Sequence, residues 1–192
     1  KLLLKLVILP NRPAQSADAY SNVWTDQGSP LIVTSIEQQK LVQADTDIPI
    51  YLGMRYGNPS TKDIVAEMKK DAIDDLLIIP LYPHYAMSSY ETAVVETMEQ
   101  LKAHGMEDIK TTLVQPFYKD PDYIDALWES IRPKFENSGA HLMMSFHGIP
   151  QRHVKVTDPS HAHCLVTKDC CTTPHPCHAT CYSHQCYATA YA

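Results

Sequence analysis

The chain has 192 residues and a formal net charge of −6, with 44% hydrophobic and 20% charged residues. This length allows one sizeable domain without disulfide support, and the composition is that of an ordinary globular protein. The negative charge argues against nucleic acid as a partner, because such binding depends on basic patches that neutralise phosphates. The sequence has no run of about 18 apolar residues that would indicate a membrane span, and it offers no support for membrane-surface association.

The two ends of the chain indicate a piece of a longer protein. The chain begins with KLLLKLVILP instead of an initiator methionine, and it stops at CYATAYA, which resembles an unfinished helix. The opening run is basic and apolar but lacks the small-residue cleavage site of a signal peptide. We predict buried structure for this run and a cytoplasmic location for the protein.

Four short runs rich in β-prone residues follow one another along the chain, separated by segments of helical periodicity. These runs are IPIYLGMRY from Ile48, LLIIPLYP from Leu76, IKTTLVQPF from Ile109 and HLMMSFHG from His141. We predict that each of them is a strand.

Three helices are predicted between these runs. Residues 60–75 open with Ser60 as a cap and an acidic residue three positions later, the pattern of a helix start. Residues 90–105 end in a cationic last turn and a glycine, the pattern of a helix end. Residues 121–139 begin with proline, and Pro133 predicts a kink.

This alternation predicts an α/β fold: a parallel, doubly wound sheet with right-handed crossovers and helices on both faces. Ligands of such sheets bind outside the carboxyl ends of the strands. The informative loops are therefore those that follow each strand, namely MRYGNP, LYPHYAMSSYE, QPFYKDP and SFHGIPQRH.

The side chains of these loops combine flat, polarizable surface with a cation and imidazoles, which suits a large planar aromatic ligand that bears carboxylates. A nucleotide is a poorer fit, because the sequence has neither GxGxxG after the first strand nor GxxxxGK[ST]. The rim residues are Met54, Arg55, Tyr56, Tyr82, His84, Tyr85, Met87, Phe117, Tyr118, Phe146 and His147.

Each of these signals has an ordinary structural alternative. His147 follows a buried run, so it is either a satisfied structural histidine or a group that takes a proton or binds a metal. Arg55 could form a salt bridge at a strand end, and the tyrosines could be packing residues. No single position decides the function.

Taken in order and spacing, four segments resemble the signatures of the ferrochelatase family. They are DAYSNVWTDQGSPL, LGMRYGNPS, PLYPHYAMSS and SFHGIPQRHV followed by DP, and the resemblance extends over nearly the whole chain to Pro159. It implies a two-lobed chelatase fold that inserts ferrous iron into a porphyrin, either protoporphyrin or coproporphyrin, in haem synthesis.

The resemblance also implies roles for individual residues. The family's essential metal-site histidine falls on His147, which would serve as iron ligand or as acceptor of a pyrrole proton. The porphyrin-contacting segments fall on Tyr20, Ser29, Met54, Arg55 and Tyr56, with Tyr82 and Tyr85 nearby. The acidic partner of the histidine belongs to the family's second lobe, so we expect residues 1–192 alone to be inactive.

We divide the chain into a first lobe over residues 1–159, which carries the porphyrin and metal edge, a cysteine-rich insertion over residues 160–186, and the start of a helix over residues 187–192 that leads to a second lobe. The insertion holds every cysteine of the chain. Loops of such length are usually functional or disordered.

The spacing of the cysteines in the insertion suits a local metal centre held by four thiolates. The four would come from Cys164, Cys170, Cys171, Cys177, Cys181 and Cys186. One of the adjacent pair Cys170 and Cys171 is expected to be a ligand, and Cys164 could replace Cys186. The family resemblance favours a two-iron two-sulfur cluster. Structural zinc assisted by His175 or His178, and disulfides or inert thiols, remain as alternatives.

Two other functions stay open from the sequence. One is a cobalt or nickel chelatase for a related tetrapyrrole, although such relatives usually lack the RYGNP and GSPL segments. The other is a non-catalytic haem- or porphyrin-binding iron-sulfur module.

Overall fold

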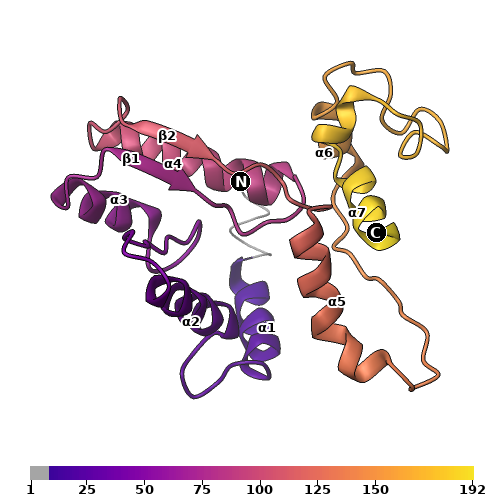
Figure 1. Ribbon diagram of the computed structural model, residues 1–192, viewed down its shortest axis with the longest axis horizontal. Coiled ribbons are helices and arrows are strands. Elements are labelled where there is room, and N and C mark those ends of the chain that lie inside the picture. The colour runs from indigo at the N-terminus through magenta and orange to yellow at the C-terminus, as the bar shows by residue number, and fades with distance from the viewer. Residues whose placement is uncertain (1–8) are drawn as a thin grey trace. The chain divides into compact units, whose positions relative to one another are not determined.

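The computed structural model describes residues 9–192 and divides the chain into two compact units, Lys1–Pro59 and Ser60–Ala192 (Figure 1). The burial predicted for KLLLKLVILP falls on side chains that lie outside the described residues. No helix of the described part is long and apolar enough to cross a membrane.

The first unit contains the helices α1 (Leu9–Ser21) and α2 (Pro30–Ala44). Between them, Thr25 and Gly28 exchange backbone hydrogen bonds of 2.9 Å across a tight turn, where Gly28 has a φ of 114° that favours glycine. The turn leads directly into α2, whose first residue is Pro30, a position at which the missing N–H of proline costs nothing.

The strand predicted from Ile48 is wrong. Gln43 donates to the carbonyls of Thr46 and Ile48 and accepts from the N–H of Ile50, and Gln39 donates to the carbonyl of Ile50 at 2.6 Å. Glutamines of α2 therefore satisfy the backbone groups that a neighbouring strand would otherwise bind, and the segment runs irregularly beside the helix.

The second unit contains a parallel pair of strands, β1 (Asp75–Ile78) and β2 (Lys110–Leu113). The pair runs in register from Asp75 opposite Lys110 to Ile78 opposite Leu113, and Figure 1 shows the two strands side by side. The crossover between them passes through a π-helical turn, η2 (Met87–Glu91), and α4 (Thr92–Ala103). The predicted α/β class and two of the predicted strands are thus confirmed.

Two helices of this unit pack against each other and hold its first apolar core. In α3 (Thr61–Lys70), the Ser60 hydroxyl accepts a hydrogen bond from the N–H of Asp63 at 3.1 Å, which confirms the predicted cap. α3 contacts α4, and Val65, Met68 and Leu101 are buried.

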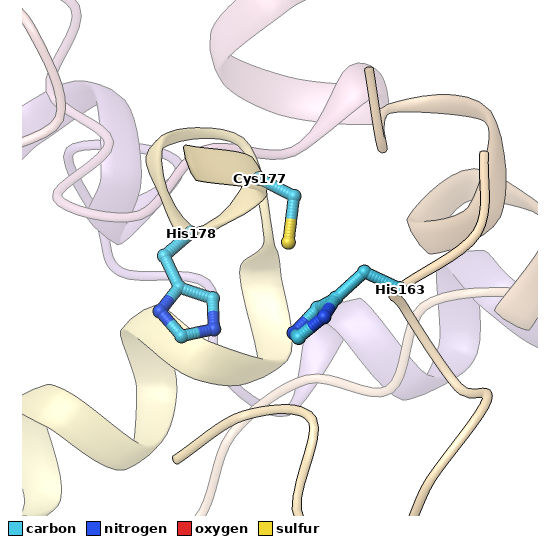
Figure 2. A group of neighbouring side chains, drawn as sticks. All are labelled: His163, Cys177 and His178. Atoms are coloured by element: carbon cyan, nitrogen blue, oxygen red, sulfur yellow. The ribbon is translucent and has the colours of Figure 1, made fainter. Parts of the chain in front are cut away.

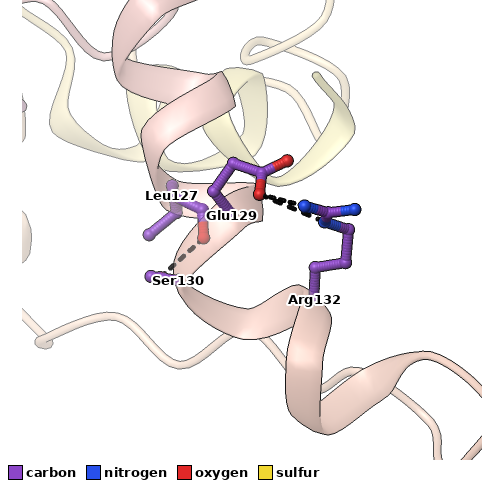
Figure 3. Close-up of polar contacts among 4 residues, drawn as sticks. All are labelled: Leu127, Glu129, Ser130 and Arg132. Atoms are coloured by element: carbon purple, nitrogen blue, oxygen red, sulfur yellow. Dashed lines mark hydrogen bonds and ion pairs between the residues drawn. The ribbon is translucent and has the colours of Figure 1, made fainter.

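The third predicted helix is α5 (Pro121–Phe135). The Asp120 side chain caps it by accepting from the N–H groups of the first turn, and Pro133 lies within its last turns. Figure 3 shows the exposed end of the helix, where Arg132 pairs with Glu129 and the Ser130 hydroxyl donates to the carbonyl of Leu127 at 2.7 Å. Such i, i+3 contacts on a solvated face contribute little to stability.

The strand predicted from His141 is also wrong. Residues 140–150 have no regular secondary structure, and the only sheet in the described part of the chain is the β1–β2 pair. A strand requires a neighbour that binds its backbone groups, whereas here the backbone of His147 bonds to the Tyr182 side chain.

The chain ends in three short elements: α6 (Gln151–Val156), the 3₁₀ turn η3 (Pro176–Ala179) and α7 (Tyr182–Tyr191). The last helix was expected from residue 187, but it begins at Tyr182, directly after Cys181. Cys186 therefore lies within the helix, and α7 contacts η3.

Candidate metal centre and ligand edge

The loops that follow β1 and β2 lie at one edge of the parallel pair, as predicted. The hydroxyl of Tyr90, in η2, donates to the carbonyl of Val114 at the end of β2 at 2.8 Å. Tyr85, in the loop after β1, has its ring 5.7 Å from that of Tyr90. Burial, helped by a hydrogen bond to Glu91, raises the pKa of Tyr85, so its hydroxyl stays neutral.

Helix α7 packs on both loops. The Thr189 hydroxyl donates to the carbonyl of Tyr118, in the loop after β2, at 2.6 Å. The same hydroxyl lies 2.8 Å from Nε2 of His84, in the loop after β1. Gln185, which is fully buried, accepts from the N–H of Tyr85 at 2.6 Å. The edge of the sheet is therefore built from residues about 100 positions apart in sequence.

His147 lies in the irregular segment 140–150, and its side chain is exposed. Its backbone bonds to the Tyr182 hydroxyl, and the neighbouring Phe146 ring meets His84 edge-on at 5.5 Å. The His84 ring also meets the Tyr182 ring edge-on at 6.0 Å. The structure thus brings the loop of His147 beside the loop of Tyr85.

Five of the predicted porphyrin contacts lie in the first unit. Ser29 immediately precedes α2, and the N–H of Met54 donates to the carbonyl of Pro59 at 2.8 Å. The Arg55 guanidinium lies 4.6 Å from the centre of the Tyr56 ring, a cation–π contact, and Tyr56 is exposed. Tyr20 is also exposed.

The two remaining predicted contacts, Tyr82 and Tyr85, lie with His147 in the second unit. Tyr82 is partly exposed, and its N–H donates to the carbonyl of Pro80 at 2.7 Å in the turn that follows β1. Tyr85 is the more buried of the two.

The insertion is built around its sulfur atoms. Cys164, Cys177 and Cys181 are each at most 5% exposed and form a core with Val154 of α6, against which Ile149 packs. The thiols are free. The sulfur atoms of Cys164 and Cys177 are 3.5 Å apart. Two thiolates on one tetrahedral metal ion with metal–sulfur bonds of about 2.3 Å would lie about 3.8 Å apart, so this pair fits one metal ion.

A second pair of sulfur atoms adjoins the first. The thiol of Cys181 is in hydrogen-bond contact with those of Cys164 and Cys171, and Cys171 also contacts Cys170. Cys186 contacts Tyr182 instead. The thiol contacts therefore run from Cys177 through Cys164, Cys181 and Cys171 to Cys170.

Burial sets the protonation of three of these thiols, Cys164, Cys171 and Cys177. Removal from water raises the pKa of Cys164, and raises that of Cys171 to about 12. Burial also raises the pKa of Cys177. Without a metal these three thiols are neutral near pH 7, and a bound cation would displace their protons.

Asp158 holds the first turn of the insertion. Its buried carboxylate accepts from the N–H groups of His163 and Cys164, both at 2.9 Å. It also accepts from the N–H and hydroxyl of Ser160, at 2.9 and 2.7 Å. Burial alone would raise the pKa of Asp158, but these four hydrogen bonds outweigh it and hold the pKa well below its usual range.

Four imidazoles stack beside the sulfurs in two pairs: His163 on His175 with centres 4.0 Å apart, and His178 on His184 at 3.6 Å. The Nε2 atoms of His163 and His178 lie 2.8 and 2.9 Å from the carbonyl of Cys170. Figure 2 shows both rings beside the sulfur of Cys177, and ligand atoms of the three residues lie within 4.8 Å of one another.

The two histidines expected to assist zinc differ in position. His175 accepts a hydrogen bond from the N–H of Cys177 at 3.2 Å and so caps η3. His178 lies near the sulfur of Cys177. Of the two, His178 is the one whose position suits a metal ligand.

Sequence reasoning missed Asp158, Tyr182, Gln185 and Thr189. For Asp158 a signal existed: an aspartate two residues before a serine is typical of a side chain that bonds its own following backbone. The other three lie on a helix whose apolar pattern is weak, and no local motif indicated what they contact.

Comparison with known proteins shows the family of the chain. The family model described as Ferrochelatase matches residues 1–192. The chain belongs to the ferrochelatase family. It is 45% identical to the ferrochelatase of Opitutus terrae over 100% of this chain and 56% of that protein. It is 42% identical to that of Stutzerimonas stutzeri over 98% of this chain and 55% of that protein.

A third relative, the ferrochelatase of Pseudomonas syringae pv. tomato, is 38% identical over 100% of this chain and 56% of that protein. The chain therefore spans about half the length of the curated relatives that it matches. The family expected from the four sequence signatures is confirmed.

Proposed function

We propose that the full-length protein inserts ferrous iron into a porphyrin, as a step of haem biosynthesis. The observation that carries this proposal is the family match over the whole chain, together with relatives named ferrochelatase at up to 45% identity. The packing of the loops after β1 and β2 at one edge supports it, since ligands of parallel sheets bind there. The cytoplasmic location expected from the sequence stays a prediction.

In this proposal His147 acts as the iron ligand or as the acceptor of a pyrrole proton. Its exposed imidazole, in a loop tied down by Tyr182, is accessible to a substrate and yet anchored. Porphyrin contacts are assigned to the aromatic and cationic rim residues. They are Tyr20, Ser29, Met54, Arg55, Tyr56, Tyr82 and Tyr85.

The test is anaerobic metal insertion by the full-length protein with protoporphyrin and ferrous iron, beside a His147→Ala variant. We expect the Soret and visible absorbance bands of the metalloporphyrin to form with wild type and not with the variant, while both proteins bind porphyrin. Binding without insertion in wild type would favour a binding module. Faster insertion of cobalt or nickel than of iron would favour a different chelatase.

We also propose a two-iron two-sulfur cluster held by Cys164, Cys177, Cys171 and Cys181. Support comes from a chain of thiol contacts that runs from Cys177 through Cys164 and Cys181 to Cys171. Three of these thiols are buried, and the sulfur atoms of Cys164 and Cys177 are 3.5 Å apart. Four cysteine thiolates are the usual ligands of such a cluster. When bound, the cluster would link the turns of the insertion covalently and make its stability sensitive to redox conditions.

The ligand assignment is tested by metal and sulfide analysis of variants. Cys177→Ser and Cys181→Ser should lose visible absorbance, iron and acid-labile sulfide, whereas Cys186→Ser should keep them. Unchanged colour in the first two variants would contradict the assignment. Stoichiometric zinc without sulfide would point instead to a zinc centre, in which His178 is the nearest additional ligand.

A further inference from the structure

The cysteine-rich insertion and the predicted metal edge are directly connected through α7. The Tyr182 hydroxyl donates to the sulfur of Cys186 and accepts from the backbone N–H of His147. One phenol therefore contacts both a cysteine of the insertion and the backbone of the predicted iron-site residue.

A second connection runs through Gln185, three residues further along the helix. Its amide donates to the carbonyls of His178 and Ala179, at 3.1 and 2.9 Å, at the end of η3. Its oxygen accepts from the N–H of Tyr85 at 2.6 Å. Gln185 is fully buried, and three of its hydrogen-bonding positions are used, which is typical of a side chain that fixes two segments relative to each other.

The two connected segments also touch. Tyr85, Ala86 and Met87 of the ligand edge line one narrow crevice together with Thr180 and Tyr182. The residues that would carry chemistry sit in segments with no strand or helix of their own, so neighbouring side chains have to hold their backbone in place.

We propose that Tyr182 and Gln185 are positioning residues through which the ordered cysteine insertion sets the backbone of His147 and Tyr85. This inference rests on the proposed function for its effect on iron insertion, but not for the structural coupling itself. It predicts that removing either connection leaves the metal content of the insertion intact and loosens one specific loop.

The experiment compares full-length wild type with Tyr182→Phe, which removes only the hydroxyl, and with Gln185→Leu. The matched control is Tyr187→Phe, which removes the same group from an exposed position of the same helix. Amide hydrogen exchange is read in two peptides, one containing His147 and one containing Tyr85, alongside iron and sulfide content.

In Tyr182→Phe we expect exchange in the His147 peptide to rise about 10-fold, the effect of losing one hydrogen bond that anchors a loop. In Gln185→Leu the rise should fall on the Tyr85 peptide. Iron and sulfide should match wild type in both, and Tyr187→Phe should match wild type throughout.

Iron insertion provides the second readout. In Tyr182→Phe we expect kcat to fall about 10-fold with KM for porphyrin changed by less than about 2-fold, because a displaced His147 weakens chemistry more than binding. If wild type inserts no iron, the proposed function fails, and the exchange data still decide the coupling. Exchange in Tyr182→Phe equal to that in Tyr187→Phe would overturn the inference. Loss of the whole fold in Tyr182→Phe would also overturn it, because the hydroxyl would then support the entire unit.

Discussion

The helical region, residues 60–114 with α3, β1, α4 and β2, and the cysteine-rich insertion are stabilised in different ways. In the first, backbone groups bind one another in strands and helices, and Val65, Met68 and Leu101 supply an apolar core. In the second, side chains bind the backbone: Asp158 alone accepts four hydrogen bonds, and imidazoles meet the carbonyls of Cys170 and Cys171. An irregular segment can thus be fully ordered when polar and sulfur side chains satisfy its backbone.

This difference predicts where the loss of a single side chain lowers the free energy of unfolding most. In the insertion, removing one group leaves several buried donors or acceptors unpaired. In the helical region, removing one cap leaves the remaining helix and its apolar contacts in place. Urea unfolding of the full-length protein measures each case.

The largest effect is expected for Asp158→Ala. It leaves the buried N–H of Cys164, the partly buried N–H of His163 and both donors of Ser160 without their acceptor. We therefore expect the free energy of unfolding to fall by about 3 kcal/mol. Asp169→Ala, an exposed carboxylate of the same segment, is the control and should cost less than about 1 kcal/mol. Equal losses in the two variants would contradict the role assigned to Asp158.

A smaller effect is expected for Thr180→Val. The hydroxyl of Thr180 donates to the carbonyl of Thr157 at 2.6 Å, and that of Thr157 donates back to the carbonyl of Thr180 at 3.1 Å, which joins the end of α6 to the end of η3. The isosteric change removes the first of these bonds, and we expect the free energy of unfolding to fall by about 1–2 kcal/mol. Thr172→Val, at an exposed turn, should show no comparable shift in the urea midpoint.

In the helical region, Ser60→Ala removes the cap of α3 and should lower the free energy of unfolding by about 1 kcal/mol. Ser60→Gly should restore most of the loss, because glycine tolerates the capping conformation. A cost above that of Asp158→Ala would reverse the contrast between the two regions.

The smallest effect concerns pH and the His84 ring, which lies among Phe146, Tyr182 and Thr189. Burial lowers the pKa of His84, so the unfolded chain takes up a proton first as the pH falls below about 6.5. The stability that neutral His84 contributes is therefore complete above that pH and is lost as the pH falls toward the folded pKa. Tyr182 stays neutral in this range.

Unfolding of wild type and His84→Gln at pH 7.5 and 5.5 checks this sign. Wild type should lose more stability between the two pH values than the variant does. The same loss in both proteins would show that other groups dominate the acid sensitivity.

The strand predictions show where sequence reasoning succeeded and failed. The runs from Leu76 and Ile109 are strands because each has the other as its partner. The runs from Ile48 and His141 have similar composition, yet glutamines of α2 bind the first, and Tyr182 binds the backbone of the second. The composition of a segment indicates its tendency to adopt an extended backbone. Whether a strand forms depends on a neighbouring strand that binds its backbone groups.

The candidate site divides in the same way. The sequence predicted its residue types, the loop that holds His147 and the cysteine-rich insertion. The Ser60 cap and the helix end at Gly105 were likewise predicted from neighbours a few positions away. These features depend on interactions within one or two turns of chain, which the local sequence encodes.

Only the tertiary structure decided which sulfurs meet and what holds the ligand edge. Gln185 binds Tyr85 across 100 positions, and Thr189 binds His84 across 105. The preference for Cys164 over Cys186 as the partner of Cys177 and Cys181 has the same origin, since Cys186 is turned toward Tyr182 on α7. Contacts at such separation form only when the whole unit has folded, because no local pattern lowers the entropy cost of bringing those segments together.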